Sequence, residues 1–172
     1  MTPSIDMTDM EIRATARADI AAVDDLLARS YPALLKADYP ASVMLLALPL
    51  ISRAQPELVL SGTFYGAFKE DVLLGAGGWT KAPPGRGRGR ADVAHIRHFV
   101  TDPAYTRQGV ASAIMNHCLQ EARASGAREM MCQATYTAVP FYGHMGFEAL
   151  GEITVPLRAG IDFPAIRMRR AL

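Results

Sequence analysis

The chain contains little cysteine, little net charge and no long apolar run, and each shortage excludes a class of protein. Cys118 and Cys132 are the two cysteines among 172 residues, which is too few for a disulfide framework. A net charge of +1 gives no overall field that favours nucleic acid or an anionic membrane. The longest apolar run, residues 43–51, is too short to cross a hydrocarbon layer of about 30 Å. We therefore expect a cytoplasmic protein with reduced thiols and neither a nucleic-acid nor a membrane partner.

The beginning of the sequence also lacks the pattern of a secretory signal. Acidic residues Asp6, Asp9 and Glu11 occur where a signal peptide carries basic residues followed by an apolar stretch. The length of 172 residues and the apolar fraction of 50% suit one globular domain, residues 1–172, with a core of useful size.

The first part of the chain predicts one strand and two helices. Residues 11–15 form the candidate strand, and an amphipathic helix follows, with apolar side chains at Ile20, Val23, Leu27 and Tyr31. Residues 43–53 are apolar on nearly every side and contain Pro49, so we expect a short helix that is kinked or ends early. We interpret its surplus apolar surface as core or as a dimer contact; the alternative is the wall of a substrate pocket.

The middle of the chain predicts a hairpin and then a crossover. Residues 63–68 and 72–80 read as paired strands, and residues 93–101 as the next strand. A helix follows with its apolar side chains on one face, ended by Gly126, and residues 130–134 form another strand. A strand, helix and strand in this order make the two strands parallel.

The last part predicts a short helix over residues 138–144 and a closing antiparallel pair, residues 147–155 and 163–169. Together these elements predict an α+β fold. Its mixed, mainly antiparallel sheet has about seven strands with a central parallel pair, and about four helices flank it.

A stretch rich in proline, glycine and arginine, residues 83–90, interrupts the strands and has nothing to bury, so we expect it to be mobile. Arginine alternating with glycine also binds RNA in some proteins, and such binding is the third hypothesis for this chain. The stretch is short and has no interleaved aromatic residue for stacking on bases, which disfavours that hypothesis.

The most informative segment is residues 100–111, where a strand passes through a turn into the start of a helix. The first N–H groups of a helix lack partners within it, and the helix dipole places partial positive charge there. Gly109 leaves room for a phosphate to approach the backbone. The segment therefore predicts an anion site that suits a phosphorylated ligand. A Walker loop would need Lys-Ser or Lys-Thr after the last glycine, and a dinucleotide fold would need further glycines. The segment has neither, so both of these nucleotide sites are disfavoured.

Two motifs resemble the GNAT superfamily of acyl-CoA-dependent N-acetyltransferases. The first is Phe99-Val100-Thr101-Asp102-Pro103 followed by Thr106-Arg107-Gln108-Gly109-Val110-Ala111, and the second is Phe141-Tyr142-Gly143-His144-Met145-Gly146-Phe147. The order of elements is similar along the whole chain, and the specific likeness runs from about His95 to Phe147. Two positions depart from the family pattern: Thr106 replaces Arg or Gln, and Thr135 replaces an Asn that many members carry.

The resemblance implies acetyl-CoA as acyl donor and no metal. It implies that the residues that contact acetyl-CoA are Phe99, Val100, Thr101, Thr106, Arg107, Gln108, Gly109, Val110, Ala111, Ser112, Thr135 and Phe141. Because backbone N–H groups supply most of the hold on the pyrophosphate, we expect Thr106 to weaken binding only modestly. Thr135 removes one expected contact to the pantetheine arm.

The resemblance also implies catalytic residues. Tyr142 is expected to donate a hydrogen bond or a proton to the leaving thiolate, and the Val100 N–H to bind the oxyanion. His95 lies where related enzymes carry a base or water-holding residue; the alternative is a structural histidine. Strict alternation along the strand would put His95, Arg97 and Phe99 on one face and His98 on the other, which argues against a metal site shared by the two histidines.

We expect direct attack by a primary amine of a small molecule or peptide on acetyl-CoA in a ternary complex. Cys118 and Cys132, in apolar stretches, are not expected to act as nucleophiles. The alternative function is a non-catalytic acyl-CoA sensor or regulatory domain. Acceptor contacts are expected from residues 31–53 and the closing strands, with Tyr39 and Arg97 available. A homodimer is possible through the closing strands and the apolar second helix.

Overall fold

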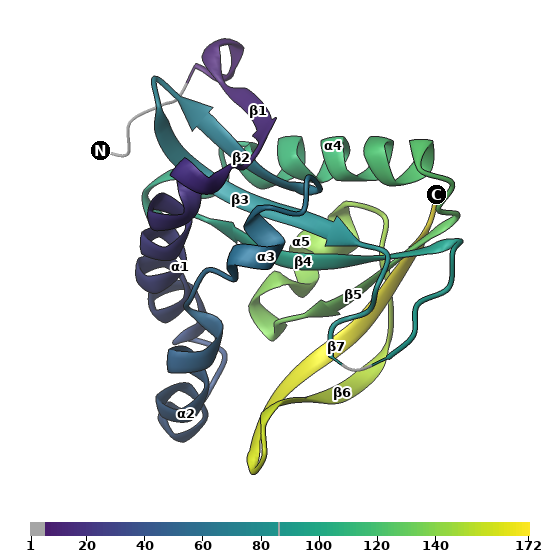
Figure 1. Ribbon diagram of the computed structural model, residues 1–172. Coiled ribbons are helices and arrows are strands. Elements are labelled where there is room, and N and C mark those ends of the chain that lie inside the picture. The colour runs from purple at the N-terminus through teal and green to yellow at the C-terminus, as the bar shows by residue number, and fades with distance from the viewer. Residues whose placement is uncertain (1–5, 86) are drawn as a thin grey trace.

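The computed structural model describes residues 6–85 and 87–172, which form one twisted sheet with helices on both faces (Figure 1). The strands are β1 (Glu11–Ala14), β2 (Phe64–Lys69), β3 (Val72–Thr80), β4 (Val93–Thr101), β5 (Glu129–Ala134), β6 (Glu148–Arg158) and β7 (Ile161–Ala171). The helices are α1 (Ile20–Leu35), α2 (Ala41–Ile51), α3 (Pro56–Val59), α4 (Val110–Ala124) and α5 (Val139–His144). Short 3₁₀ turns occur at Met7–Asp9, Arg17–Asp19, Pro103–Tyr105 and Tyr136–Ala138.

The seven strands lie in the order β1-β2-β3-β4-β5-β7-β6. The β4–β5 pair is parallel and the other neighbours are antiparallel. The predicted mixed sheet with one central parallel pair is therefore confirmed. The hairpin between β2 and β3 closes through Glu70 and Asp71, whose φ angles are 49° and 65°, the left-handed values that a tight two-residue hairpin requires.

Two apolar cores separate the layers. Side chains of α4 and α5 pack with one face of the sheet in the first core, which includes Ile114, Met130 and Tyr142. Side chains of α1 and α2 pack with the other face in the second core, which includes Leu27 and Phe64. The helical periodicity of α1 and α4 explains this division, because each of these two helices turns its apolar stripe toward the sheet. Helix α2 is apolar on more than one side and leaves Leu45 and Leu46 exposed.

Strands β4 and β5 pair over three residues and then separate. They are paired at Val93–Glu129, Ala94–Met130 and His95–Met131, so the remainder of each strand diverges from the other. Beyond this point β5 stays paired with β7 as far as Ala134. The parallel pair therefore opens into a V-shaped gap at the centre of the sheet.

A bulge in β4 overturns the expected alternation of its side chains. Gly78 pairs with Arg97 while Ala76 pairs with Val100, so β4 has one more residue than β3 across this interval, and His98 takes φ 46°. Because the extra residue reverses the alternation, Phe99 packs in the first core with Ala94 and Ile96, and Val100 enters the second. The prediction that Phe99 shares a face with His95 and Arg97 was wrong.

Three smaller differences also have physical causes. The four-residue α3 has too few residues to show a periodic pattern, and was not predicted. Helix α2 runs past Pro49 to Ile51, so proline ends it within two residues rather than at once. Residues 83–90 carry no helix or strand in their described part, and Arg86, which belongs to the predicted Gly/Arg stretch, lies outside the described residues. No described helix has the length and apolar character needed to cross a membrane.

Candidate active site

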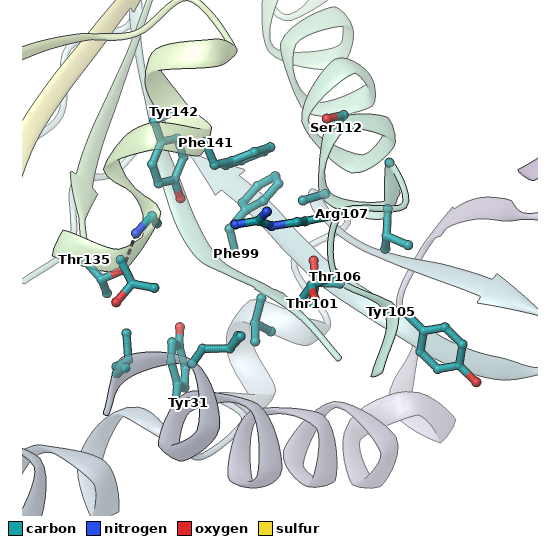
Figure 2. A pocket seen from close by; sticks show the side chains of 18 residues that line it. Tyr31, Phe99, Thr101, Tyr105, Thr106, Arg107, Ser112, Thr135, Phe141 and Tyr142 are labelled. Carbon is teal, nitrogen blue, oxygen red and sulfur yellow. Dashed lines mark hydrogen bonds between the residues drawn. The ribbon is translucent and has the colours of Figure 1, made fainter. Parts of the chain in front are cut away.

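A cavity of about 430 Å³ opens where β4 ends and α4 begins (Figure 2). Its walls come from the C-terminal part of α1, the end of β4, the turn into α4 and the segment from Thr135 to Tyr142. We call it the donor cavity. It lies at the open end of the gap between β4 and β5, since Val100 and Thr135, one from each side of that gap, both line it.

The turn that forms the floor of this cavity has an unusual backbone. Arg107 and Gly109 adopt left-handed φ angles of 61° and 85°, and α4 starts at the next residue, Val110. Gly109 stands at the N-cap position and has no side chain to cap the helix. The first N–H groups of α4 are thus available to an anion, which the helix dipole also favours.

Asp102 fixes this turn in place, a role that the sequence analysis did not identify. Its Oδ1 accepts a hydrogen bond from the N–H of Ala104 at 2.9 Å, and its Oδ2 lies 2.8 Å from Nη2 of Arg29 on α1. The same carboxylate therefore shapes the turn and ties it to α1. An aspartate before proline at the end of a strand is the signal that indicated such a turn.

The donor cavity brings together nearly all of the residues predicted to contact acetyl-CoA. Those that line it are Phe99, Val100, Thr101, Thr106, Arg107, Gly109, Val110, Ala111, Ser112, Thr135 and Phe141. Gln108 is the predicted residue that does not line it. The hydroxyl groups at the two positions that differ from the family pattern make local contacts. Thr106 donates to the carbonyl of Pro103 (3.4 Å), and Thr135 accepts from the N–H of Ala138 (3.3 Å).

Tyr142 lines the donor cavity and is only 4% exposed. Its ring contacts Phe141, Phe99 and Phe147, with centroids 5.3, 6.4 and 5.5 Å away. Burial, followed by the neighbouring Cys132, raises the pKa of Tyr142 well above its ordinary value. The hydroxyl therefore remains protonated and can donate a hydrogen bond. Its partner in the structure is the side chain of Cys132.

A second tyrosine faces the same space from the opposite wall. Tyr31 rises from α1 while Tyr142 descends from α5, and Figure 2 shows both hydroxyls turned into the cavity. Burial raises the pKa of Tyr31 as well, so it too is a protonated donor. The sequence analysis placed Tyr31 in the apolar stripe of a helix and also at the start of residues 31–53, which were expected to contact the acceptor. The structure places it in the wall of the donor cavity.

His95 lies outside the donor cavity and lines a second one, of about 250 Å³. We name it the acceptor cavity after the role proposed for it below. It is also bordered by Ile96 from β4 and by Cys132 and Gln133 from β5, all just past the last β4–β5 pair. Both cavities therefore border the gap between β4 and β5. The acceptor cavity lies next to the last residue pair, and the donor cavity lies at the ends of the two strands. Cys132 lines one cavity while its side chain contacts Tyr142 in the other.

Burial lowers the pKa of His95, and the positive charge of Arg97 lowers it further. The imidazole is therefore mainly neutral at pH 7 and able to accept a proton. His98, in the bulge, is held neutral more strongly, because burial and then Arg97 lower its pKa to about 4. Its Nε2 accepts a hydrogen bond from Gln55 Nε2 at 3.1 Å.

Arg97 contacts the same glutamine. Its Nη2 lies 3.5 Å from Gln55 Oε1 and its Nη1 lies 3.3 Å from Thr80 Oγ1. Because His98 and Arg97 share Gln55 as a partner, His98 lies on the side of Arg97 and not on the opposite face that alternation predicted. Among the residues that the structure describes, no three His, Cys, Asp or Glu side chains are grouped to hold a metal ion.

Tyr39, expected to be available to an acceptor, has a structural role instead. Its hydroxyl donates to the carbonyl of Pro164 (2.8 Å) and accepts from the N–H of Tyr136 (2.9 Å). Its ring stacks on Tyr136 and Phe163. The cysteines are buried, and burial raises the pKa of both Cys118 and Cys132, so neither is a reactive thiolate at neutral pH.

Comparisons with known proteins identify a family model and relatives that match this chain. Residues 53–170 match the model of the acetyltransferase (GNAT) domain. The chain is 31% identical over 62 residues to glucosamine 6-phosphate N-acetyltransferase from Trypanosoma brucei brucei, a match that covers 36% of this chain and 42% of that protein. The matches span half or less of the length of the curated relatives.

Solved structures share the fold over almost the whole chain. A GCN5-related N-acetyltransferase from Rhodopseudomonas palustris superposes with a TM-score of 0.73 at 20% identity, covering 94% of this chain and 95% of that one. The PaiA N-acetyltransferase from Thermoplasma acidophilum, solved in complex with coenzyme A, gives a TM-score of 0.70 at 16% identity, with 95% and 99% covered.

Proposed function

The chain belongs to the acetyltransferase (GNAT) domain family, and on that premise we propose that it transfers an acetyl group from acetyl-CoA to a primary amine of a small molecule or peptide. The observation that carries this proposal is the pair of cavities that meet the gap between β4 and β5. One has the phosphate-binding features of a donor site, and the other gives an acceptor access to the same gap.

The donor cavity has the features that acetyl-CoA requires. The uncapped start of α4 and the left-handed turn before it suit the pyrophosphate. The apolar rings of Phe99 and Phe141, whose centroids are 6.4 Å apart, suit the pantetheine arm. In this arrangement the thioester reaches the neighbourhood of Tyr142, and the structural relative solved with coenzyme A supports that choice of ligand.

The proposed reaction is a direct attack within a ternary complex. The neutral amine attacks the thioester carbonyl carbon, the new C–N bond forms, and the C–S bond breaks to release CoA. His95 takes the proton of the amine, directly or through a water, because its lowered pKa keeps it neutral. The backbone N–H of Val100, which the resemblance implied for the oxyanion, points toward β3 and not into the gap, because the Asp102 N–H donates to the carbonyl of Leu74 and Val100 pairs with Ala76.

Tyr142 assists the departing thiolate. Its raised pKa makes full proton transfer from the phenol unfavourable, so its larger contribution is a charge-assisted hydrogen bond to the sulfur. The side chain of Cys132 is the neighbour of this hydroxyl in the structure.

Calorimetric titration with acetyl-CoA, free CoA and ATP is the first test. We expect acetyl-CoA and CoA to bind and ATP not to bind. A panel of primary amines is then screened for release of free CoA with a thiol reagent, for which the buried Cys118 and Cys132 add little background. Absence of binding at millimolar acetyl-CoA would overturn the proposal. Binding without CoA release from any amine would instead favour the acyl-CoA sensor.

A further inference from the structure

The sheet face beside the acceptor cavity gathers basic side chains from two strands. Ala94 and Ile96 point into the first core, so His95 and Arg97, which alternate with them before the bulge, face the opposite side. On β7, Met168 and Ile166 also belong to the first core, which puts Arg167 on the same face as Arg97. Arg167 lines the acceptor cavity together with His95.

These arginines have no anionic partner in the described part of the chain. The ion pairs there involve Arg13, Arg29, Arg90 and Arg169. The contacts of Arg97 are with the neutral side chains of Thr80 and Gln55, although burial is sufficient to lower its pKa. The described residues that line the acceptor cavity include no aspartate or glutamate. Arg97 is partly buried, and a partly buried cation is costly without a counter-charge. Arg167 is exposed and lines the cavity itself, so an anion bound there would place a counter-charge on this face of the sheet.

The geometry points to an acceptor that carries a carboxylate or a phosphate as well as its amine. We propose that Arg167, assisted by Arg97, binds the anionic group while the amine lies beside His95 at the gap between β4 and β5. A guanidinium offers two parallel N–H donors to either anion, so both chemistries share this recognition. The inference rests on the proposed acetyl transfer and specifies the substrate class of that site.

The test compares amines in pairs, one member with an anionic group and one without it, at equal concentration of the neutral amine. The pairs are amino acids against their amides, O-phosphoethanolamine against ethanolamine, and glucosamine 6-phosphate against glucosamine, each measured as kcat/KM for CoA release. We expect the anionic member to be preferred by about ten- to a hundredfold, the range of one charge-assisted hydrogen bond. The amino-acid arm and the phosphate arms show which anion the site takes.

Two variants connect the preference to these residues. Arg167→Gln changes an exposed side chain and should remove most of the preference by raising KM for the anionic amine, with kcat little changed. Arg97→Lys retains the charge and tests the second arginine with less risk to folding. Arg158→Gln removes one charge from an exposed position near the β6–β7 turn and should leave the preference intact.

The possible outcomes separate this inference from the proposed function. Equal kcat/KM within every pair, or a preference that Arg167→Gln leaves unchanged, would overturn the anionic acceptor while acetyl transfer stands. CoA binding with no turnover for any amine, charged or neutral, would overturn acetyl transfer itself and with it this inference. A preference that disappears in Arg167→Gln and persists in Arg158→Gln would support it.

Discussion

The donor and acceptor cavities border the same gap but are built in different ways. The donor cavity presents the backbone of a turn and a helix start, with mostly apolar walls. The acceptor cavity presents side chains, His95, Gln133 and Arg167 among them. A backbone site tolerates substitutions because its donors do not depend on residue type, whereas a side-chain site changes with each one. The first therefore suits a fixed donor, and the second suits an acceptor that differs between relatives.

The largest expected effect tests Tyr142, which lines the donor cavity and contacts Cys132, a residue of the acceptor cavity. Tyr142→Phe removes the hydrogen bond to the departing sulfur, and we expect kcat to fall about a hundredfold, as for loss of one transition-state donor. Acetyl-CoA affinity, measured by calorimetry, should change little because the backbone provides most of the binding. Unchanged kcat would remove Tyr142 from the mechanism.

A smaller effect is expected on the acceptor side. His95→Gln should lower kcat/KM by about tenfold, less than the roughly hundredfold at which the usual range of general-base catalysis begins. In the native protein, activity should fall as pH drops through the pKa of His95, which burial and Arg97 hold below the usual value of about 6.5. The imidazole gains a proton there and can no longer act as a base.

The pH profile decides between this role and a structural one. His95→Gln should lose that acidic limb and keep any limb that belongs to the acceptor amine itself. If the variant retained the complete native profile, His95 would be structural, as the alternative interpretation of the sequence held.

A third change tests the backbone of the donor cavity. Gly109→Ala forces an alanine into a left-handed conformation (φ 85°), at a cost of about 1–2 kcal/mol. Relaxation of the turn should weaken acetyl-CoA binding about fivefold, since it moves the N–H groups that hold the anion. Gly126→Ala is the control: its φ is 96°, its surroundings are open, and it lies at the far end of α4.

Thermal unfolding and calorimetry distinguish the two glycine variants. Both should lower the melting temperature by a similar amount. Only Gly109→Ala should weaken acetyl-CoA binding. A parallel loss of affinity in Gly126→Ala would mean that general destabilisation explains the effect.

The smallest effect is expected at the position that departs from the family motif. The Thr106 hydroxyl contacts the carbonyl of Pro103 at 3.4 Å, a weak interaction. Thr106→Ala should therefore change the Kd of acetyl-CoA by less than about twofold, within the range of neutral surface substitutions. A tenfold loss in calorimetry would show that the side chain, not the backbone, holds the phosphates.

The sequence predicted the elements whose structure depends on residues that are neighbours in the chain. Strand β4 begins and ends at the predicted residues, Val93 and Thr101, because its apolar residues and flanking polar segments mark both ends. The donor cavity followed from the turn and the two motifs. The residues of the turn are close in sequence, because a strand followed directly by a helix positions them, whereas the other walls of the cavity come from α1 and from the segment between Thr135 and Tyr142.

The parts that were missed depend on pairing between distant segments. The bulge at His98 exists only relative to β3, so β4 alone gave no sign of it and the faces of Phe99 and His98 were predicted incorrectly. Tyr31 reaches the donor cavity because α1 crosses the end of β4, and Tyr39 is occupied by Pro164 and Tyr136. Separation of His95 from the donor cavity likewise depends on where β4 leaves β5.

The bulge in β4 gives one short strand two independent uses. Residues before it, His95 and Arg97, face the acceptor side, and the single inserted residue re-aims those after it, so that Phe99 and Val100 border the donor cavity. On the proposed function, substitutions before the bulge can therefore change acceptor specificity, while the residues after the bulge continue to bind the same donor. Variant libraries confined to position 97 on β4 and position 167 on β7, with His95 kept as the proposed base, are accordingly the direct route to a new acceptor specificity.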